Sequence, residues 1–229
     1  MAMDFITIVF LVYSFLAFYF LFLFLLTYLQ NKREFFLTPP ITKEYSLSIV
    51  VPCYNGEEHI ADTINGLLNL KYNKLKKIIV VDDCSTDNSY AIAKEYEKKY
   101  PDKIKVVQTP KNTGCSAGAK NYGAKFVNTE LIGFTDDDSM PEKDSVNYMI
   151  GFFDDNKVGA VTSTVLVQNR NNFILRLQSI EYKVIKFSRK LLEFLDSIYV
   201  TPGPLAIYRK SAFDDVNGFD EKNLTEDIE

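Results

Sequence analysis

Strand-like runs of apolar, β-branched residues alternate with helix-like segments through the middle of this chain. The strand-like runs lie at residues 47–51, 77–81, 104–108 and 131–135, and the segments with apolar residues at helical spacing lie at 60–70, 88–100, 116–126 and 143–153. Such alternation predicts right-handed crossovers and a mainly parallel sheet with helices on both faces. A length of 229 residues leaves room for one such α/β domain and an appendage.

The pattern changes after the fourth strand and helix. Residues 159–167 predict a longer alternating strand, residues 173–198 a helix, and residues 205–209 a last strand. Apolar residues recur along the predicted helix in steps of four and three and form one stripe. The stripe fits either packing on the core or a helix that lies on a membrane surface. The second interpretation is supported by the basic residues Arg176, Lys183, Lys186, Arg189 and Lys190.

The appendage is an N-terminal run of about 25 residues without a charge, from Phe5 to Leu29, long enough to cross a bilayer. A cleaved signal peptide is the competing interpretation. However, the run is too long, and it has neither a basic segment before it nor a small-residue cleavage site after it. Lys32 and Arg33 follow the run and only Asp4 precedes it, so the positive-inside rule places the rest of the chain in the cytoplasm. The sequence therefore predicts a single-pass protein of the cell membrane.

Composition divides the chain into three parts. Residues 1–34 are the predicted transmembrane anchor, residues 35–45, with Pro39 and Pro40, a linker, and residues 46–229 the globular domain. The net charge of −4 gives no electrostatic reason to expect nucleic acid as a partner.

Three cysteines recur at equal intervals, at Cys53, Cys84 and Cys115. Each follows a predicted strand, so the interval reflects one strand-and-helix step. A metal site of three cysteines is disfavoured, because thiolate ligands usually come in close CxxC pairs. The odd number of cysteines also fits a reducing compartment.

Carboxylates directly follow two of the predicted strands. Asp82 and Asp83 come after the second strand, and three aspartates, residues 136–138, come after the fourth. Because parallel strands end at one edge of a sheet, where open α/β sheets bind ligands, we expect these side chains there. The chain has a single histidine, and its carboxylates suit a hard divalent cation, Mg²⁺ or Mn²⁺, that brings in a diphosphate. The signatures GxGxxG and GxxxxGK(S/T) are absent, which argues against a dinucleotide or P-loop enzyme.

Four motifs in a fixed order carry a family resemblance. They are Val51-Pro52-Cys53-Tyr54-Asn55, the run from Val81 to Asp87, the aspartates at 136–138, and Thr225-Glu226-Asp227. In this order and spacing, the chain resembles the family-2 glycosyltransferases, which implies a GT-A fold for the part that follows the anchor. Gln178, Glu181 and Tyr182 add a similarity to processive synthases of the hyaluronan, chitin and poly-N-acetylglucosamine type.

The resemblance implies a pocket for the nucleotide of a sugar donor. Asp83 would accept a hydrogen bond from the base, most simply the uracil N3–H of a UDP-sugar. Pro52, Tyr54 and Asn55 would shape the pocket, with Tyr54 offering its face to the base. The alternative for Asp82 and Asp83 is that they cap a turn.

Two further donor contacts follow from the same resemblance. Gly56 stands where many members have glutamate, so Glu57 is the expected substitute. Lys120 lies in a stretch that passes close to the donor in the family, and it would pair with a phosphate. The alternative for Lys120 is a surface lysine on a helix.

The three aspartates at 136–138 correspond to the metal-binding motif of the family. Asp138 would coordinate Mg²⁺ or Mn²⁺, and Asp136 would lie against the ribose or take part in metal binding. Asp137 is assigned to binding of the nucleotide sugar. Three successive carboxylates repel one another, which favours a bound cation over a bare acidic turn.

The resemblance makes Asp227 the general base for the acceptor hydroxyl in an inverting displacement. The predicted function is a metal-dependent transfer of a sugar from a UDP-sugar to a saccharide or lipid-linked acceptor, as in polysaccharide synthases. The alternatives are a polyprenyl-phosphate glycosyltransferase and a non-catalytic nucleotide-sugar-binding subunit. Those synthases continue into a Q-x-x-R-W motif and further membrane spans, whereas this chain has no tryptophan, so we expect a fragment of a longer enzyme or a natural truncation.

Overall fold

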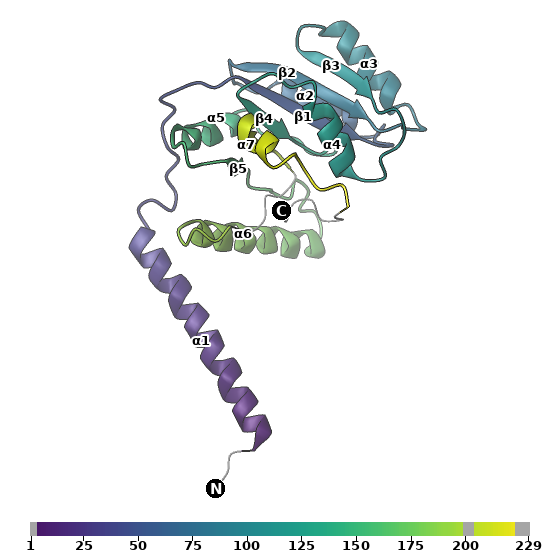
Figure 1. The fold of residues 1–229 in the computed structure, drawn as a ribbon. Helices are drawn as coiled ribbons and strands as arrows, with labels where there is room; N and C mark the ends of the chain where they lie inside the picture. Colours follow the sequence, from purple (N-terminus) through teal and green to yellow (C-terminus); the bar gives the residue numbers. More distant parts are fainter. Residues whose placement is uncertain (1–3, 199–203, 223–229) are drawn as a thin grey trace. The chain divides into compact units, whose positions relative to one another are not determined.

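The computed structural model describes residues 4–198 and 204–222 (Figure 1). Contacts divide the chain into two units. The first combines residues 1–37 with residues 165–198, and the second combines residues 38–164 with residues 199–229. We call them the helical unit and the sheet unit.

The sheet unit is built on a six-stranded sheet with the order β3-β2-β1-β4-β6-β5. Its strands are β1 (Leu47–Cys53), β2 (Leu75–Asp82), β3 (Ile104–Gln108), β4 (Leu131–Phe134), β5 (Ala160–Thr162) and β6 (Ala206–Arg209). Strands β1 to β4 run parallel, whereas β6 is antiparallel to β4 and β5. The expectation of a mainly parallel sheet is therefore confirmed.

Helices cover both faces of the sheet. They are α2 (Ile60–Leu68), α3 (Ser89–Lys99), α4 (Ser116–Ala124), α5 (Ser145–Ile150), a 3₁₀ turn (Gly151–Asp154) and α7 (Lys210–Asp215). Side chains of β1 alternate between two cores: Ile49 and Val51 pack with α2, α3 and α5, whereas Val50 packs with α4 and α7. Each buried aliphatic side chain stabilises the fold by roughly 1.5–3 kcal/mol, which explains the continuous apolar run of this strand.

A glycine allows α4 to approach the sheet closely. A Cβ atom on Gly123 would lie 2.5 Å from a methyl carbon of Val50 and 2.6 Å from one of Val81. Since real Cβ atoms do not approach other carbons so closely, a larger residue here would push α4 off the sheet. Gly123 therefore sets the distance between α4 and strands β1 and β2.

The strand order reverses between β1 and β4, and we call the space outside the carboxyl ends of these two strands the crevice. The chain runs outward from β1 through β2 to β3, and then returns to β4 on the other side of β1. Cys53 lies opposite Asp82 in the register of β1 and β2, so these strands end together. Open α/β sheets bind ligands where the strand order reverses in this way.

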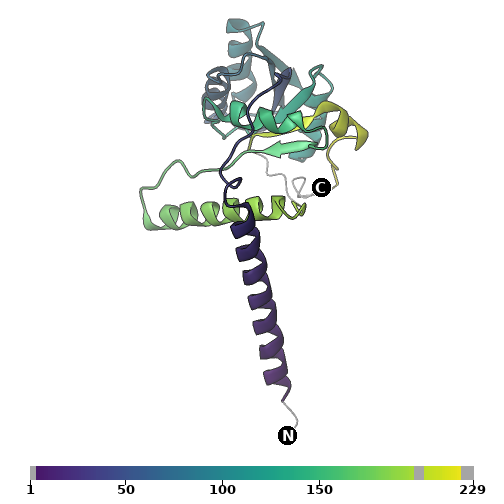
Figure 2. The same ribbon diagram turned by 90° about the vertical axis from the view of Figure 1, so that its left-hand side faces the viewer.

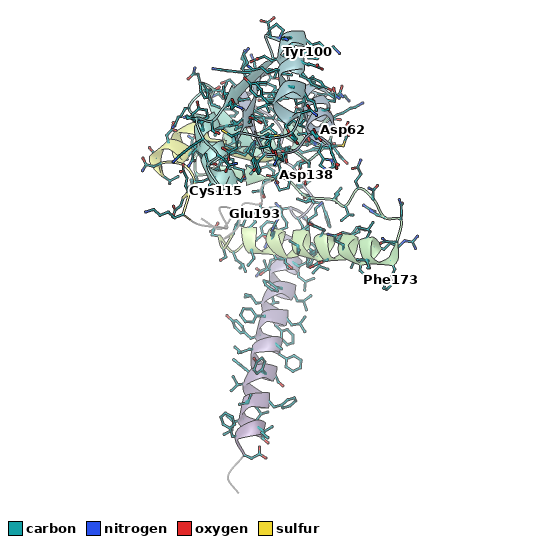
Figure 3. The ribbon with its side chains drawn as sticks, turned by 90° about the vertical axis from the view of Figure 1, so that its right-hand side faces the viewer. Asp62, Tyr100, Cys115, Asp138, Phe173 and Glu193 are labelled. Carbon is teal, nitrogen blue, oxygen red and sulfur yellow. The ribbon has the colours of Figure 1, made fainter. Side chains whose placement is uncertain are left out.

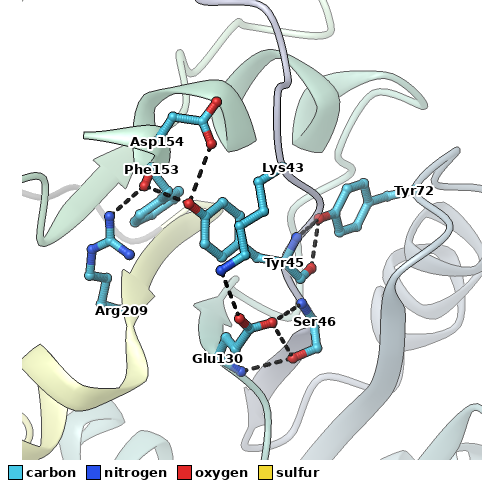
Figure 4. A network of polar contacts seen from close by, with 8 residues as sticks. All are labelled: Lys43, Tyr45, Ser46, Tyr72, Glu130, Phe153, Asp154 and Arg209. Atoms are coloured by element: carbon cyan, nitrogen blue, oxygen red, sulfur yellow. Dashed lines mark hydrogen bonds and ion pairs between the residues drawn. The ribbon is translucent and has the colours of Figure 1, made fainter. Parts of the chain in front are cut away.

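A hydrogen-bond network closes the opposite end of the sheet unit (Figure 4). The hydroxyl of Tyr45 donates to the carbonyl of Phe153 at 2.9 Å, and the Arg209 guanidinium donates to the same carbonyl. The hydroxyl of Tyr72 donates to the carbonyl of Tyr45 at 2.6 Å. Burial raises the pKa of Tyr72 to about 12, so this hydroxyl keeps its proton.

Glu130 forms the outer part of that network. Its carboxylate accepts hydrogen bonds from the backbone N–H of Ser46 at 2.9 Å and from the Ser46 hydroxyl at 3.1 Å, and it pairs with Lys43 at 3.3 Å. The bonds from Ser46, more than any other cause, hold the pKa of Glu130 below its ordinary value of 4.5. These contacts join the starts of β1 and β4 and leave their carboxyl ends to the crevice.

The helical unit consists of α1 (Phe5–Asn31) and α6 (Phe173–Glu193). Among the described residues, α1 is the one helix long and apolar enough to cross a membrane. Its first turn is capped by Asp4, whose carboxylate accepts from the N–H of Thr7 at 2.7 Å. Figure 2 shows α6 lying across the C-terminal end of α1.

Aromatic side chains join these two helices. The Phe187 ring of α6 lies 5.7 Å from Tyr28 and 5.0 Å from Phe35, measured between ring centroids, and Phe194 lies 6.3 Å from Phe35. Such pairs contribute about 0.5–1.5 kcal/mol beyond the area they bury.

The structure differs from the sequence expectations in the later part of the chain. The strand expected at 159–167 is reduced to β5, and the helix expected at 143–153 divides into α5 and the 3₁₀ turn. Helix α7 was not expected. The helix expected at 173–198 ends at Glu193 instead. It ends there because Asp196 adopts a left-handed φ of 49°, and the N–H of Ser197 then closes on the carbonyl of Leu192 at 2.9 Å.

The apolar stripe of α6 is largely outside the core. Phe173, Leu177 and Ile180 are 74%, 50% and 57% exposed, respectively. The interpretation of the stripe as core packing is therefore wrong for this part of the helix. The reason is that α6 follows the strand-and-helix units and belongs to the helical unit, where its packing partner is α1.

Candidate active site

The turns after β1 and β2 are joined by polar contacts at the crevice. Asn55 and Cys84 adopt left-handed φ values of 54° and 60°. The side-chain carbonyl of Asn55 accepts from the N–H of Thr86 at 2.8 Å, and the N–H of Asn55 donates to the hydroxyl of Ser85 at 3.0 Å. Left-handed residues other than glycine are uncommon and gather at functional sites, since surrounding contacts must hold them. Asn55, which the sequence predicts to line the nucleotide pocket, thus also holds the turn after β2.

The Asp83 carboxylate is buried and holds the loop that follows β3. It accepts from the hydroxyl of Thr109 at 2.7 Å, and from the hydroxyl and N–H of Thr113 at 2.7 and 3.0 Å. These bonds use most of the acceptor capacity of a carboxylate. A base bound at Asp83 would share this group with Thr113, a residue whose role the sequence alone did not reveal.

The neighbouring Asp82 has a different environment. One carboxylate oxygen accepts from the side-chain amide of Gln108 at 2.8 Å, whereas the other, Oδ1, is buried without a hydrogen-bond partner in the described part of the chain. Orphaned buried oxygens of this kind are rare in folded proteins and mark functional positions or water sites. The turn-capping alternative applies only in part, because Ser85 N–H donates to Asp82 at 3.3 Å.

Asp137 faces inward, against the end of β1. Its carboxylate interacts with the thiol of Cys53, and burial raises the pKa of Asp137. Burial also raises the pKa of Cys53 to about 12, so this cysteine is a thiol rather than a metal-binding thiolate. A Cβ atom on Gly56 would collide with the Asp137 carboxylate. The glycine at position 56 is therefore required by the inward position of Asp137.

Asp136 and Lys120 bring a charge pair into the crevice. Lys120, from α4, is only 2% exposed, and its ammonium lies 3.9 Å from the carboxylate of Asp136. The ammonium also lies 5.5 Å from the ring centroid of Phe219. A buried ammonium persists only where anionic or polar groups compensate its lost hydration. Lys120 is therefore not the surface lysine of the alternative interpretation.

Asp138 is exposed in the turn after β4 (Figure 3). The hydroxyl of Ser139 donates to it at 3.4 Å. Within residues 4–198 and 204–222, no group of three or more His, Cys, Asp and Glu side chains is arranged to hold a metal ion. Asp136 and Asp138 supply two carboxylates, which fits the way Mg²⁺ binds together with substrate phosphates.

The other predicted pocket residues lie around β1. Pro52 is buried within the strand, opposite Val81, and Tyr54 is 54% exposed just after it. Glu57 accepts from the N–H and the side-chain amide of Asn88, both at 2.9 Å, and so holds the start of α3. Its nucleotide role stays a prediction, since its carboxylate is engaged by the protein.

A side chain of α4 fastens the last described segment to the sheet unit. The Asn121 amide donates to the carbonyl of Phe219 at 2.8 Å and accepts from the N–H of the same residue at 2.9 Å. Gly218 is left-handed, with φ 79°, and a Cβ atom there would lie 2.5 Å from the Asn121 side chain. The predicted base Asp227 follows this segment and lies outside the described residues.

Solved glycosyltransferases share this fold. The mannosyltransferase PcManGT from Pyrobaculum calidifontis, solved with GDP-Man and Mn2+, superposes with a TM-score of 0.69 at 22% identity, covering 90% of this chain and 57% of that chain. S. aureus TarS 1-349 in complex with UDP-GlcNAc gives a TM-score of 0.56 at 23% identity over 80% of this chain and 51% of that chain. The expected GT-A fold is confirmed.

The family follows from the sequence match. Residues 48–216 match the family described as Glycosyl transferase family 2, and the chain belongs to that family. Poly-beta-1,6-N-acetyl-D-glucosamine synthase from Staphylococcus epidermidis is 33% identical over 184 residues, which are 80% of this chain and 44% of that protein. The synthase of Staphylococcus aureus strain COL is 34% identical over 187 residues with the same coverage. The chain thus spans less than half the length of these relatives.

Proposed function

We propose that this chain carries the donor site of a metal-dependent, inverting glycosyltransferase. It would transfer a sugar from a UDP-sugar to a saccharide or lipid-linked acceptor, as in polysaccharide synthases. The observation that carries the proposal is the buried ammonium of Lys120, 3.9 Å from Asp136 in the crevice at the end of β4. A transferase site must accept a diphosphate, and this pair together with Asp138 offers charges of both signs for it.

The charges suggest how a diphosphate would bind. Asp136 and Asp138 would hold Mg²⁺ or Mn²⁺, and Lys120 would pair with a phosphate oxygen. When bound, the metal would neutralise negative charge on the departing diphosphate. Burial of Lys120 keeps its ammonium in place and in a medium of low dielectric constant, where its attraction for phosphate is stronger than in water.

The choice of uridine rests on two supports. TarS has been solved in complex with UDP and with UDP-GlcNAc, and the related synthases are named for N-acetyl-D-glucosamine. In this chain, Asp83 would accept from the uracil N3–H beside the Thr113 contacts, with the exposed face of Tyr54 against the base. Pro52, Asn55 and Asp137 would shape the pocket around them.

Transfer needs a base on the acceptor side, and Asp227 is our proposal for it. The acceptor would reach the sheet unit at the cytoplasmic surface of the cell membrane. There α1 would anchor the chain, with the positive residues after it on the cytoplasmic side.

Calorimetric titration of the full chain with UDP tests the donor site. We expect Mn²⁺ to be required, so that a chelator reduces UDP affinity at least tenfold, because diphosphate and carboxylates repel without a cation between them. Asp138→Asn should reproduce the chelator effect in the presence of Mn²⁺. Asp144→Asn is the matched control, since Asp144 is also solvent-facing but pairs with Lys71 at 3.5 Å. Equal UDP binding with and without metal would contradict the metal site.

The same titration tests the observation on which the proposal rests. Lys120→Met keeps the volume of the buried stem but removes the charge, and should weaken UDP binding roughly tenfold or more, the scale of a charge-assisted hydrogen bond. Lys125→Met, at the C-cap of the same helix, should bind UDP like the unchanged chain. Similar UDP affinities for both variants would remove Lys120 from the donor site.

A further inference from the structure

The stripe of α6 divides into a covered and an uncovered part. At its C-terminal end, Leu191 is 1% exposed, and Phe187 packs against Tyr28 and Phe35 at the end of α1. Further toward the N-terminus, Leu177 and Ile180 lie on the same face and are 50% and 57% exposed, respectively. One continuous apolar face thus begins on α1 and runs on without a protein partner in the described residues.

The helix geometry gives the orientation of this apolar face. A helical face is continuous along the axis, so residues in steps of three and four from Phe187 face the side on which Phe187 meets Tyr28 of α1. Figures 2 and 3 both show α1 running away from α6 on one side. The uncovered part of the stripe therefore looks in the direction in which α1 extends.

We infer that the stripe of α6, from Phe173 to Val184, lies in the surface of the lipid bilayer that α1 enters. The inference rests on the membrane anchoring in the proposed function. A helix that crosses the end of a membrane span, with its apolar side toward that span, has its apolar side chains at the level of the lipid headgroups and upper acyl chains. The lipid surface covers the stripe where α1 no longer reaches.

The charges on α6 fit this position. The helix carries five basic residues and two acidic ones, within a chain whose net charge is −4. Lys183 stands on the flank of the stripe and Lys186 further round the helix, where long basic side chains reach anionic headgroups. A second protein copy on the stripe would give no reason for this local excess of positive charge.

The absence of tryptophan makes the position of α6 measurable. Because the chain has no tryptophan, one introduced residue supplies the only indole signal. Ile180→Trp reports on the stripe, Tyr182→Trp on the opposite side of the same helix, and Phe15→Trp on the middle of α1. Each full-length variant is reconstituted in vesicles of phosphatidylcholine and phosphatidylglycerol that carry bromine either high on the acyl chain or at its middle.

We expect shallow bromines to quench Ile180→Trp at least about twofold more than they quench Tyr182→Trp, because an interfacial helix buries its apolar face only about 5–10 Å. Mid-chain bromines should quench Phe15→Trp most strongly. If Phe15→Trp is quenched and Ile180→Trp is not, the membrane-surface position of α6 is overturned while the anchor stands. If Phe15→Trp is unquenched by mid-chain bromines, the anchor fails, and Ile180→Trp still decides the position of α6.

A second copy of the chain is the other occupant that the test identifies. In that case, Ile180→Trp would stay unquenched but emit at shorter wavelength, and its emission would depend on the number of chains per vesicle. That result would overturn the lipid assignment. Ile180→Asn, if it folds, provides a second measurement, since it should increase hydrogen exchange along α6 in vesicles but leave exchange in the sheet unit unchanged.

Discussion

At the scale of single residues, the three aspartates of one sequence motif have different contacts and different exposure. Three successive aspartates follow β4, yet Asp136 meets Lys120, Asp137 turns inward to Cys53, and Asp138 is exposed. The three residues lie in the turn after β4, and the three carboxylates do not share one environment. Only the exposed and half-buried members remain open to a metal and a diphosphate.

Gly56 tests the inward position of Asp137. Gly56→Ala should destabilise the sheet unit by about 1–3 kcal/mol, since its Cβ would collide with the Asp137 carboxylate and force a buried group to move. Urea unfolding of the sheet unit measures the change. Gly66→Ala in α2 is the matched control, because its Cβ would meet nothing closer than 3.4 Å and alanine favours a helix. Equal stabilities of the two variants would contradict the assigned position of Asp137.

Glu130 provides a prediction for how the stability of the fold depends on pH. Its pKa is lowered in the folded state, so its contribution to stability is fully present above 4.5, its ordinary value, and is lost as pH falls through the folded pKa. Glu130→Gln should cost about 1 kcal/mol or less at pH 7, a small value because the side chain is half exposed and screened. Unfolding measured from pH 7 to pH 3 should show this difference shrink.

The control for that series is Glu58→Gln, whose side chain is 85% exposed. Its difference from the unchanged chain should stay near zero over the whole pH range. A difference for Glu130→Gln that is constant with pH would show that the Ser46 contacts do not depend on the charge of Glu130.

At the scale of elements, α4 connects the two sides of the proposed site. Its successive residues Lys120 and Asn121 reach Asp136 and Phe219, respectively. Gly123 holds the helix close to β1 and β2, so both contacts depend on one helix position. The segment that precedes the proposed base is thereby fixed to the same helix that carries Lys120, the lysine proposed to bind phosphate.

Asn121→Asp tests this connection. The change keeps the size of the side chain but replaces the donor to the Phe219 carbonyl with an oxygen that repels it, at a cost of about 1–3 kcal/mol. Hydrogen exchange at residues 218–221 should increase, while exchange in β1 to β3 stays slow. Asn156→Asp, in an exposed turn, is the control. Unchanged exchange at Phe219 would mean that other contacts hold the segment.

At the scale of the whole molecule, one chain combines a helix long and apolar enough to cross a membrane with a glycosyltransferase fold. The chain covers 44% of the length of its relative from Staphylococcus epidermidis. The proposed donor side, built on β1, β2 and β4, lies within the sheet unit. The acceptor side is represented by the proposed base Asp227.

Asp227 should affect turnover and not donor binding, since a general base contacts the acceptor. In protein that transfers sugar, Asp227→Asn should lower turnover roughly 100-fold or more, the scale of general acid–base catalysis, with UDP affinity nearly unchanged. UDP release and calorimetry measure the two quantities. Glu221→Gln, at the end of the fastened segment, is a control for charge alone. Near-normal turnover of Asp227→Asn would assign the base to another residue.

Local patterns alone determined the order of the first four strands and helices, the anchor candidate and the family. These features depend on periodicity and on motif order, which are written within a few residues of each other: β3 lies where its apolar run predicted, and α1 follows the uncharged run. Motif order in the same way placed carboxylates at the ends of β2 and β4.

Only the tertiary structure decided what each of those groups contacts. Lys120 becomes a buried partner of Asp136 because α4 packs closely on β1, and the stripe of α6 stays outside the core because its end packs on α1. Asp83, which follows β2, accepts a hydrogen bond from Thr113, which lies 30 residues further along the chain. Such contacts join segments that no local pattern relates, since burial and charge pairing depend on which surfaces meet after the chain has folded.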